Sequence, residues 1–223
     1  MAAGEHASIT KMEDLAEQMC AIGQRAYGRQ LVAGTEGNFS CRMPENRVLC
    51  TPTGVCKGLM RPADLCVVSL DGQQMEGTRR CSSEIPMHLR MYQSDDGVQA
   101  IVHTHPPFAT TLAVLDPVDL TGVLPEGDIF LGMVPQITYQ TPGTPDMATA
   151  LLPLLKDHSA TLLQNHGAVT WGPDLETAYI LMETLEALCR IVYQARLIGQ
   201  IRSIPANKRA ELAELRAKLR GEA

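Results

Sequence analysis

The chain has 223 residues, of which 45% are hydrophobic and 20% are charged. This composition excludes disordered and fibrous proteins, and the length suits one globular α/β domain with a full core. The formal net charge of −6 argues against sequence-independent nucleic-acid binding, which requires a basic surface. No apolar run approaches the roughly 20 residues that span a membrane, so we expect neither a nucleic acid nor a membrane as a partner.

The first part of the chain predicts one long helix followed by short strands. Residues 1–9 are expected to form a flexible tail. Thr10 and Glu13 have the spacing of a capping box, and apolar residues at helical spacing predict a helix over 10–28. Strand-like runs follow at 38–43, 47–51 and 66–70. Short strands joined by tight turns are typical of antiparallel pairing.

The rest of the chain alternates helices and strands. A strand is expected over 100–105, and Pro106 and Pro107 end it. The other predicted elements are helices at 83–93, 107–115, 146–156, 174–198 and 207–220, strands at 131–139, 160–164 and 168–171, and a loop at 116–127. We therefore predict a single α/β domain over 1–223, with three α/β/α layers, a mixed, largely antiparallel central sheet and a C-terminal helix within 205–223.

His103 and His105 are the first candidates for chemistry. Residues two apart on a strand point to the same face, so both imidazoles would project together from the end of the predicted strand. This spacing can supply half of a zinc site from three residues. A polar pair on the surface is the alternative interpretation.

His166 lies between two predicted strands in the sequence Asn165-His166-Gly167. The glycine permits a tight backbone turn, which places His166 at its tip. Taken alone, His166 is better explained as a surface residue. With the two earlier histidines it completes a three-histidine set with an open position, which is the pattern of catalytic zinc.

Ser82, Ser83 and Glu84 stand at the start of a predicted helix. Hydroxyl groups and free backbone N–H groups at such a place favour an anion such as phosphate, while a simple N-cap is the alternative. His88 falls one helical turn after Glu84 and is either a neighbour of the site or structural.

Five motifs occur in order over some 130 residues and together resemble the class II aldolase/epimerase family, which includes L-fuculose-1-phosphate aldolase and L-ribulose-5-phosphate 4-epimerase. The motifs are Gly37-Asn38-Phe39-Ser40, Thr51-Pro52-Thr53-Gly54, Ser82-Ser83-Glu84, His103-Thr104-His105-Pro106 and Asn165-His166-Gly167. The resemblance covers residues 10–200. It implies a three-layer fold and a homotetramer with active sites at subunit interfaces.

The resemblance also implies roles for individual residues. One Zn²⁺ per subunit would be held by His103, His105 and His166, with Co²⁺, Ni²⁺ or Mn²⁺ as alternative ions. Glu84 would be the catalytic acid/base and a further ligand in the resting enzyme. The phosphate of a small phosphorylated sugar would be bound by Gly37, Asn38, Thr53, Gly54, Ser82 and Ser83.

The implied reaction is cleavage of a fuculose-1-phosphate-like ketose to dihydroxyacetone phosphate and an aldehyde. A glutamate at position 84, where the epimerase branch carries aspartate, favours the aldolase branch. A 4-epimerase, dehydratase or decarboxylase of the same family remains an alternative. A non-catalytic, adducin-like assembly domain is the alternative from another class.

The second proton donor is the point at which the chain departs from the aldolase pattern. The aldolase branch has a tyrosine in the region that Leu124, Pro125 and Glu126 occupy here. Glu126 and Asp128 are the candidates, and two solvated loop carboxylates are the alternative.

The seven cysteines are odd in number and include no CxxC pair. They therefore argue against a disulfide framework or a thiolate zinc site. No signal-peptide pattern is found at the N-terminus, and the prediction is a cytoplasmic enzyme with reduced thiols.

Overall fold

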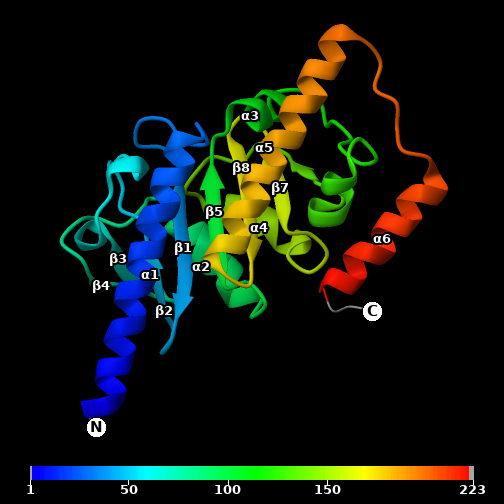
Figure 1. Ribbon diagram of the computed structural model, residues 1–223. Helices are drawn as coiled ribbons and strands as arrows, with labels where there is room; N and C mark the ends of the chain where they lie inside the picture. Colours follow the sequence, from blue (N-terminus) through cyan, green and yellow to red (C-terminus); the bar gives the residue numbers. More distant parts are fainter. Residues whose placement is uncertain (1, 221–223) are drawn as a thin grey trace.

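The computed structural model describes residues 2–220, with side chains from residue 12 to residue 219. Its centre is an eight-stranded sheet in the order β4-β3-β2-β1-β5-β8-β7-β6 (Figure 1). The strands are β1 (Asn38–Met43), β2 (Arg47–Cys50), β3 (Cys66–Ser69), β4 (Gln74–Glu76), β5 (Ala100–Thr104), β6 (Gln136–Ile137), β7 (Ala160–Leu163) and β8 (Gly167–Gly172). Only β6 and β7 pair in parallel, so the predicted mixed, largely antiparallel sheet is confirmed.

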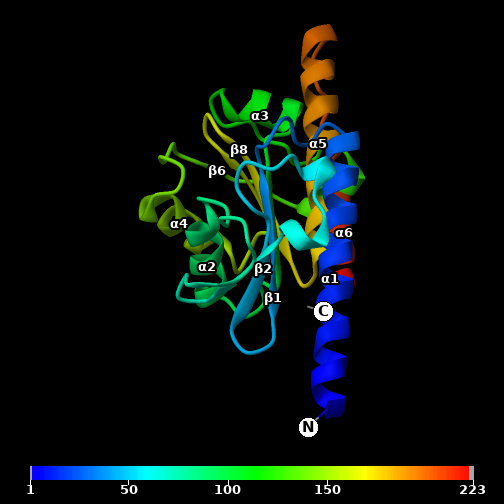
Figure 2. The same ribbon diagram turned by 90° about the vertical axis from the view of Figure 1, so that its left-hand side faces the viewer.

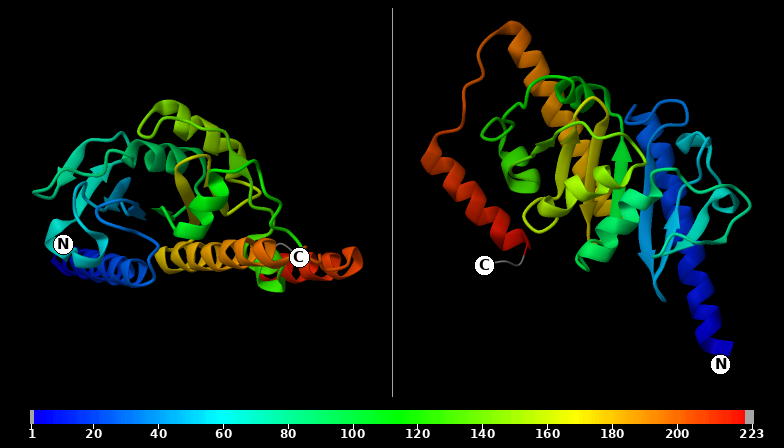
Figure 3. Two further views of the ribbon diagram at one scale, coloured as in Figure 1. Left: turned by 90° about the horizontal axis from the view of Figure 1, so that it is seen from above. Right: turned by 180° about the vertical axis from the view of Figure 1, so that it is seen from behind.

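Helices cover both faces of this sheet, which confirms the three-layer α/β/α architecture. One face carries α1 (Ala2–Gly28), α3 (Pro107–Ala113) and α5 (Leu175–Ile198), and the other carries α2 (Ile85–Ser94) and α4 (Pro145–Leu151). Figure 2 shows the sheet between these layers, and Figure 3 shows α1 and α5 together in one of them. The last helix, α6 (Ala206–Arg220), packs against the helical turn Gly127–Leu131. No helix among residues 2–220 is long and apolar enough to cross a membrane.

Three predicted boundaries were wrong. Helix α1 begins at Ala2, so Thr10 lies inside it and the predicted capping box is not its start. Most of the strand predicted over 131–139 is absent: Leu131 ends the helical turn Gly127–Leu131, and only Gln136–Ile137 pairs as a strand. Short apolar runs do not distinguish a buried strand from a buried helical turn. Helix α4 ends at Leu151, two residues before Pro153, and continues only as a 3₁₀ turn.

The register around β5 brings distant parts of the chain to one place. All five residues of β5 are buried, as expected of a strand covered on both faces. In this register Asn38 of β1 is the partner of His103, and His103 is the partner of Val169 in β8. The turn between β7 and β8 therefore lies beside the end of β5, with Asn165 in the left-handed region at φ 56°.

Replacement of Gly167 by alanine should destabilise this turn. A Cβ added there would lie 2.5 Å from the Thr104 carbonyl oxygen and 2.7 Å from Cδ2 of His105. Relief of such overlap requires backbone shifts that cost about 1–3 kcal/mol. Denaturant unfolding of Gly167→Ala should show this loss. Gly28→Ala is the matched control, because an added Cβ meets nothing within 4 Å there; equal stability of both variants would contradict the prediction.

Candidate metal centre and active site

Three imidazoles converge at the end of β5. His103 and His105 come from this strand and its exit, and His166 comes from the turn between β7 and β8. One nitrogen atom from each ring lies within 4.8 Å of the others, and the ring centroids are 4.7–4.9 Å apart. His103 is fully buried, while the other two are partly exposed. The structure thus brings together the three histidines that the sequence predicted as ligands.

The hydrogen bonds of two rings leave their inner nitrogen atoms free for a cation. Nδ1 of His103 lies 2.9 Å from the Ala168 carbonyl oxygen, and Nδ1 of His105 lies 3.1 Å from a carboxylate oxygen of Glu36. Both partners accept, so both Nδ1 atoms donate. The two Nε2 atoms are 3.1 Å apart, and in neutral rings both then carry lone pairs. A metal ion between them would remove this repulsion, so the donor set fits a divalent ion such as zinc.

Glu84 lies against the same nitrogen atoms. One carboxylate oxygen is 3.3 Å from Nε2 of His103, and the other is 3.5 Å from Nε2 of His166. The Asn38 side-chain amide donates a hydrogen bond of 2.8 Å to the first oxygen. Asn38, predicted as a phosphate ligand, is therefore engaged here in holding Glu84.

The environment sets the charges of these groups. Burial by itself raises the pKa of Glu84, but the hydrogen bond and charge of His103, with the charge of His166, lower it well below its usual range. Burial, aided by the charge of His103, lowers the pKa of His166 to about 4. An ionised carboxylate and a neutral imidazole are the forms that bind metal ions.

The structure brings together the segments that contain the predicted phosphate ligands. A β-bridge joins Pro52 to Cys81, and the Ser82 amide donates to the Thr51 carbonyl at 3.2 Å. The Thr51 amide in turn donates to the Phe39 carbonyl at 3.0 Å. The segments around residues 37–38, 51–54 and 81–84 are therefore neighbours beside Glu84.

The individual residues of these segments differ in their availability. Ser83 is exposed, while Ser82 is buried and its hydroxyl accepts the Glu84 amide at 3.3 Å. The Thr53 amide donates a hydrogen bond of 3.0 Å to the Arg80 carbonyl oxygen. The glycines at 37 and 54 adopt φ values of +73° and +69°, which side chains rarely adopt. Phosphate binding by this set stays a prediction.

The candidates for a second proton donor lie apart from this cluster within one chain. Glu126 is exposed, and Asp128 accepts a hydrogen bond of 2.7 Å from the Gly122 amide. Among the described residues, no hydrogen bond or ion pair joins either carboxylate to Glu84 or the three histidines. Their role also stays a prediction.

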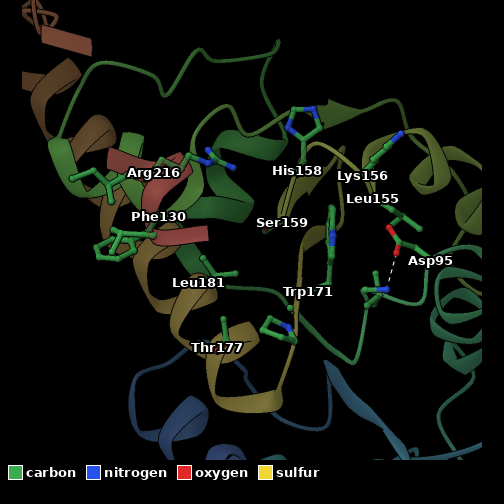
Figure 4. Close-up of a pocket in the computed structure, with 16 residues that line it drawn as sticks. Asp95, Phe130, Leu155, Lys156, His158, Ser159, Trp171, Thr177, Leu181 and Arg216 are labelled. Carbon is green, nitrogen blue, oxygen red and sulfur yellow. Dashed lines mark hydrogen bonds between the residues drawn. The ribbon is translucent and has the colours of Figure 1, made fainter. Parts of the chain in front are cut away.

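A cavity of about 770 Å³ lies at the other end of β8, between α6 and the sheet (Figure 4). Trp171, Leu155 and Phe130 contribute apolar surface, and Lys156 and Arg216 contribute charge. None of its lining residues belongs to the predicted site, so the chemistry is assigned to the histidine cluster and not to this cavity.

Glu36 is the functional candidate that the sequence did not single out. It stands in a glycine-flanked turn, and only the fold places its carboxylate on His105. Its other oxygen accepts the Ala33 amide at 2.8 Å, so the carboxylate is itself held in place. A carboxylate on the outer nitrogen of a ligand histidine fixes the tautomer and orientation of the ring.

Glu36→Gln should weaken metal binding by roughly 10- to 100-fold without unfolding the protein. The amide keeps the size of the side chain but removes the negative charge that favours the donating Nδ1 of His105. Competition for Zn²⁺ with a chromogenic chelator measures the change. Glu45→Gln removes one charge from an exposed side chain and should bind as the wild type does; equal affinities for both variants would refute the role of Glu36.

Comparison with known protein families decides the identity of the fold. The sequence pattern of the family described as "Class II Aldolase and Adducin N-terminal domain" matches residues 17–193 of this chain. The chain belongs to the class II aldolase family. Its α/β/α layers and single mixed sheet agree with the structures of this family.

Individual members of the family are similar over most of their length. A 3-oxo-tetronate 4-phosphate decarboxylase of Escherichia coli (strain K12) is 34% identical, over 92% of this chain and 96% of that protein. An L-fuculose phosphate aldolase of Methanococcus maripaludis (strain C5) is 33% identical, over 78% of this chain and 93% of that protein. The crystal structure of YgbL from Escherichia coli superposes with a TM-score of 0.83 at 32% identity, over 91% of this chain and 99% of that chain. The similar class II aldolase relatives thus include both aldolases and decarboxylases.

Proposed function

We propose that this chain is a zinc-dependent aldolase that cleaves a fuculose-1-phosphate-like ketose into dihydroxyacetone phosphate and an aldehyde. The observation that carries the proposal is the position of Glu84, whose two carboxylate oxygens lie 3.3 and 3.5 Å from imidazole nitrogens of His103 and His166. A proton-transferring group thus stands beside three convergent metal ligands. Aldolases of phosphorylated sugars among the relatives support the substrate class.

The ion would be held by His103, His105 and His166, and when bound it supplies Lewis acidity toward the substrate carbonyl and hydroxyl oxygens. Cleavage of the C3–C4 bond leaves an electron pair on C3. The Glu84 carboxylate would take up a proton from water once substrate separates it from the imidazole nitrogens, give that proton to C3 and return to its ionised form. In the reverse direction the Glu84 carboxylate removes that proton. The proton of the C4 hydroxyl passes to a second group, for which Glu126 and Asp128 are the proposed candidates.

The segments beside Glu84 would bind the phosphate. The exposed Ser83 hydroxyl and the backbone around Gly54 offer donors to an anion. Fixing the phosphate holds the reacting carbons next to Glu84, so binding energy away from the broken bond contributes to turnover.

Decarboxylation of a 3-oxo sugar-acid phosphate is the second candidate. The Escherichia coli decarboxylase favours it, because the similarity extends over 96% of that protein. Loss of carbon dioxide also leaves an electron pair on a carbon next to a carbonyl group, and Glu84 would protonate this carbon in the same way. The site chemistry is therefore common to both reactions.

We further propose a cytoplasmic homotetramer with active sites at subunit interfaces. Two large apolar side chains at the end of α5, Leu197 and Ile198, are 69% and 90% exposed in the single chain, which supports association. Sedimentation velocity would give the oligomeric state, and a monomer at micromolar concentration would refute the tetramer.

The test of the reaction is a pair of assays on protein of measured zinc content. One follows release of dihydroxyacetone phosphate from a panel of ketose 1-phosphates, and the other follows release of carbon dioxide from 3-oxo-tetronate 4-phosphate. Zinc-dependent release of dihydroxyacetone phosphate supports the aldolase. Carbon dioxide alone replaces it with the decarboxylase, and neither product from zinc-loaded protein overturns both.

A further inference from the structure

A row of polar side chains joins α2 to β1 inside the molecule. We call it the polar ladder; it consists of Glu84, His88 and Tyr92 at four-residue intervals and Asn38, Ser40 and Arg42 at two-residue intervals. Positions four apart on a helix and two apart on a strand each share one face. The ladder runs from the Glu84 carboxylate along the helix, which contacts β1 and lies beside the sheet in Figure 2.

Hydrogen bonds cross from β1 to α2 and its N-cap Glu84 at each rung. Asn38 donates to Glu84 at 2.8 Å. The Ser40 hydroxyl lies 2.6 Å from Nδ1 of His88 and 2.7 Å from the Tyr92 hydroxyl. At the far end the guanidinium of Arg42 donates to the Tyr92 carbonyl and lies 5.2 Å from the centroid of its ring.

The middle of the ladder is sealed from water. Ser40, His88 and Tyr92 are each 0% exposed. Burial, with the charge of His103 adding to it, lowers the pKa of His88 to about 3, so this imidazole is neutral. The Ser40 hydroxyl has a single proton and two lone pairs, so it donates to at most one of its two partners and accepts from at least one of them. Loss of this one oxygen atom would leave two buried groups without a partner.

Outside the ladder, most contacts of α2 are apolar and fix its position less closely; near its C-terminal end the exposed Gln93 side chain also donates to the Leu70 carbonyl at 2.6 Å. Ile85, Met87, Leu89 and Met91 are buried between the sheet and α4. Apolar burial is not directional, so it tolerates small shifts along or around the helix axis, whereas hydrogen bonds do not. A residue at the start of α2 moves with the helix, and Glu84 is that residue.

We propose that Ser40, His88 and Tyr92 are positioning residues that fix the register of α2 on β1 and thereby hold the Glu84 carboxylate against His103 and His166. The inference rests on the proposed role of Glu84 in proton transfer. It assigns a purpose to three buried polar side chains that, among the described residues, form no hydrogen bond with the three histidines of the cluster. A displacement of about 1 Å at a reacting group can lower turnover 100-fold, so the ladder acts on kcat through geometry.

Two variants test the ladder, and one serves as the control. Ser40→Ala removes the shared oxygen, and Tyr92→Phe removes only the terminal hydroxyl. Thr161→Val is matched to them, because the Thr161 hydroxyl is also fully buried and donates to a carbonyl, that of Pro135 at 3.0 Å, but on the distant strand β7. Circular dichroism and thermal unfolding establish whether each variant is folded. If Ser40→Ala does not fold, Tyr92→Phe carries the test of the proposal.

The expected result is a fall in kcat on the order of 10- to 100-fold for Ser40→Ala and a smaller fall for Tyr92→Phe, with KM and zinc content unchanged. In a Glu84→Gln background the same substitutions should produce no further fall, because they act through that carboxylate. Thr161→Val should keep the wild-type kcat. Equal kcat for wild type and both ladder variants, or a further fall in the Glu84→Gln background, would overturn the proposal.

A spectroscopic measurement separates this inference from the proposed reaction. The absorption spectrum of Co²⁺-loaded protein depends on the groups around the ion, and Glu84 lies against the nitrogen atoms that would hold it. Ser40→Ala should change this spectrum in the same direction as Glu84→Gln, and Thr161→Val should leave it unchanged. If wild type turns over neither substrate, the proposed function fails, yet this shift still supports the ladder. A wild-type spectrum for Ser40→Ala refutes the ladder in either case.

Discussion

Glu84→Gln should lose turnover by roughly 10²- to 10⁴-fold, the usual contribution of a positioned acid/base group. The amide retains the size of the side chain and can still accept from Asn38, so the fold and the register of α2 should persist. It cannot exchange the proton that C3 requires. Steady-state kinetics with the preferred substrate, on protein of measured zinc content, would show a fall in kcat at nearly constant KM.

Glu211→Gln provides the matched control, because it removes the same charge from a side chain that is 61% exposed on α6. It should retain wild-type kcat. Glu84→Gln with more than a tenth of the wild-type kcat would remove Glu84 from proton transfer and would leave it at most as a metal ligand.

His103→Ala should lose metal and activity together. This ring is fully buried, and its Nδ1 is anchored to the Ala168 carbonyl, so it is the most rigidly held of the three ligands. With two imidazoles left, the site lacks the three protein ligands of catalytic zinc centres. Elemental analysis after dialysis should show near-complete loss of zinc, and the same direction is expected for His105→Ala and His166→Ala.

His158→Ala is the control for this loss, since His158 hydrogen-bonds to the Met133 carbonyl far from the cluster. Its zinc content should equal that of the wild type. Full zinc content in all three ligand variants would refute the assignment of the metal site.

The sequence predicts the architecture well where periodicity is strong. The long apolar stripe of α5 and the buried run of β5 are both present close to their expected bounds. The short strand β4 was missed because Gln74 and Glu76 carry no apolar alternation. The strand predicted over 131–139 was wrong for all but Gln136–Ile137, and the helical turn Gly127–Leu131 just before it was missed, because a short apolar run buries equally well as a turn of helix.

The site shows the same division between local and distant information. Alternation on one strand and a glycine turn were enough to predict three histidines that do converge. The carboxylate of Glu36 could not be assigned to His105 from the sequence, because they are brought together only by the fold. The sequence left open whether His88 is a neighbour of the site or a structural residue. Its hydrogen bond to Ser40 depends on the packing of a helix against a strand that precedes it by more than 40 positions.

The convergence of His105 and His166 has a consequence for folding. The two residues are about 60 positions apart in the chain, yet their ring centroids are 4.7 Å apart. An ion held by both would link the exit of β5 to the β7–β8 turn. It would thereby stabilise the closure of the loop between them, which costs conformational entropy on folding. Because such an ion binds the native arrangement and not the open chain, chelation should lower the thermal midpoint and expose the amides of β8 to hydrogen exchange. The proposed catalytic ion would then also stabilise the fold, because it would connect β5 to β8 in the central sheet.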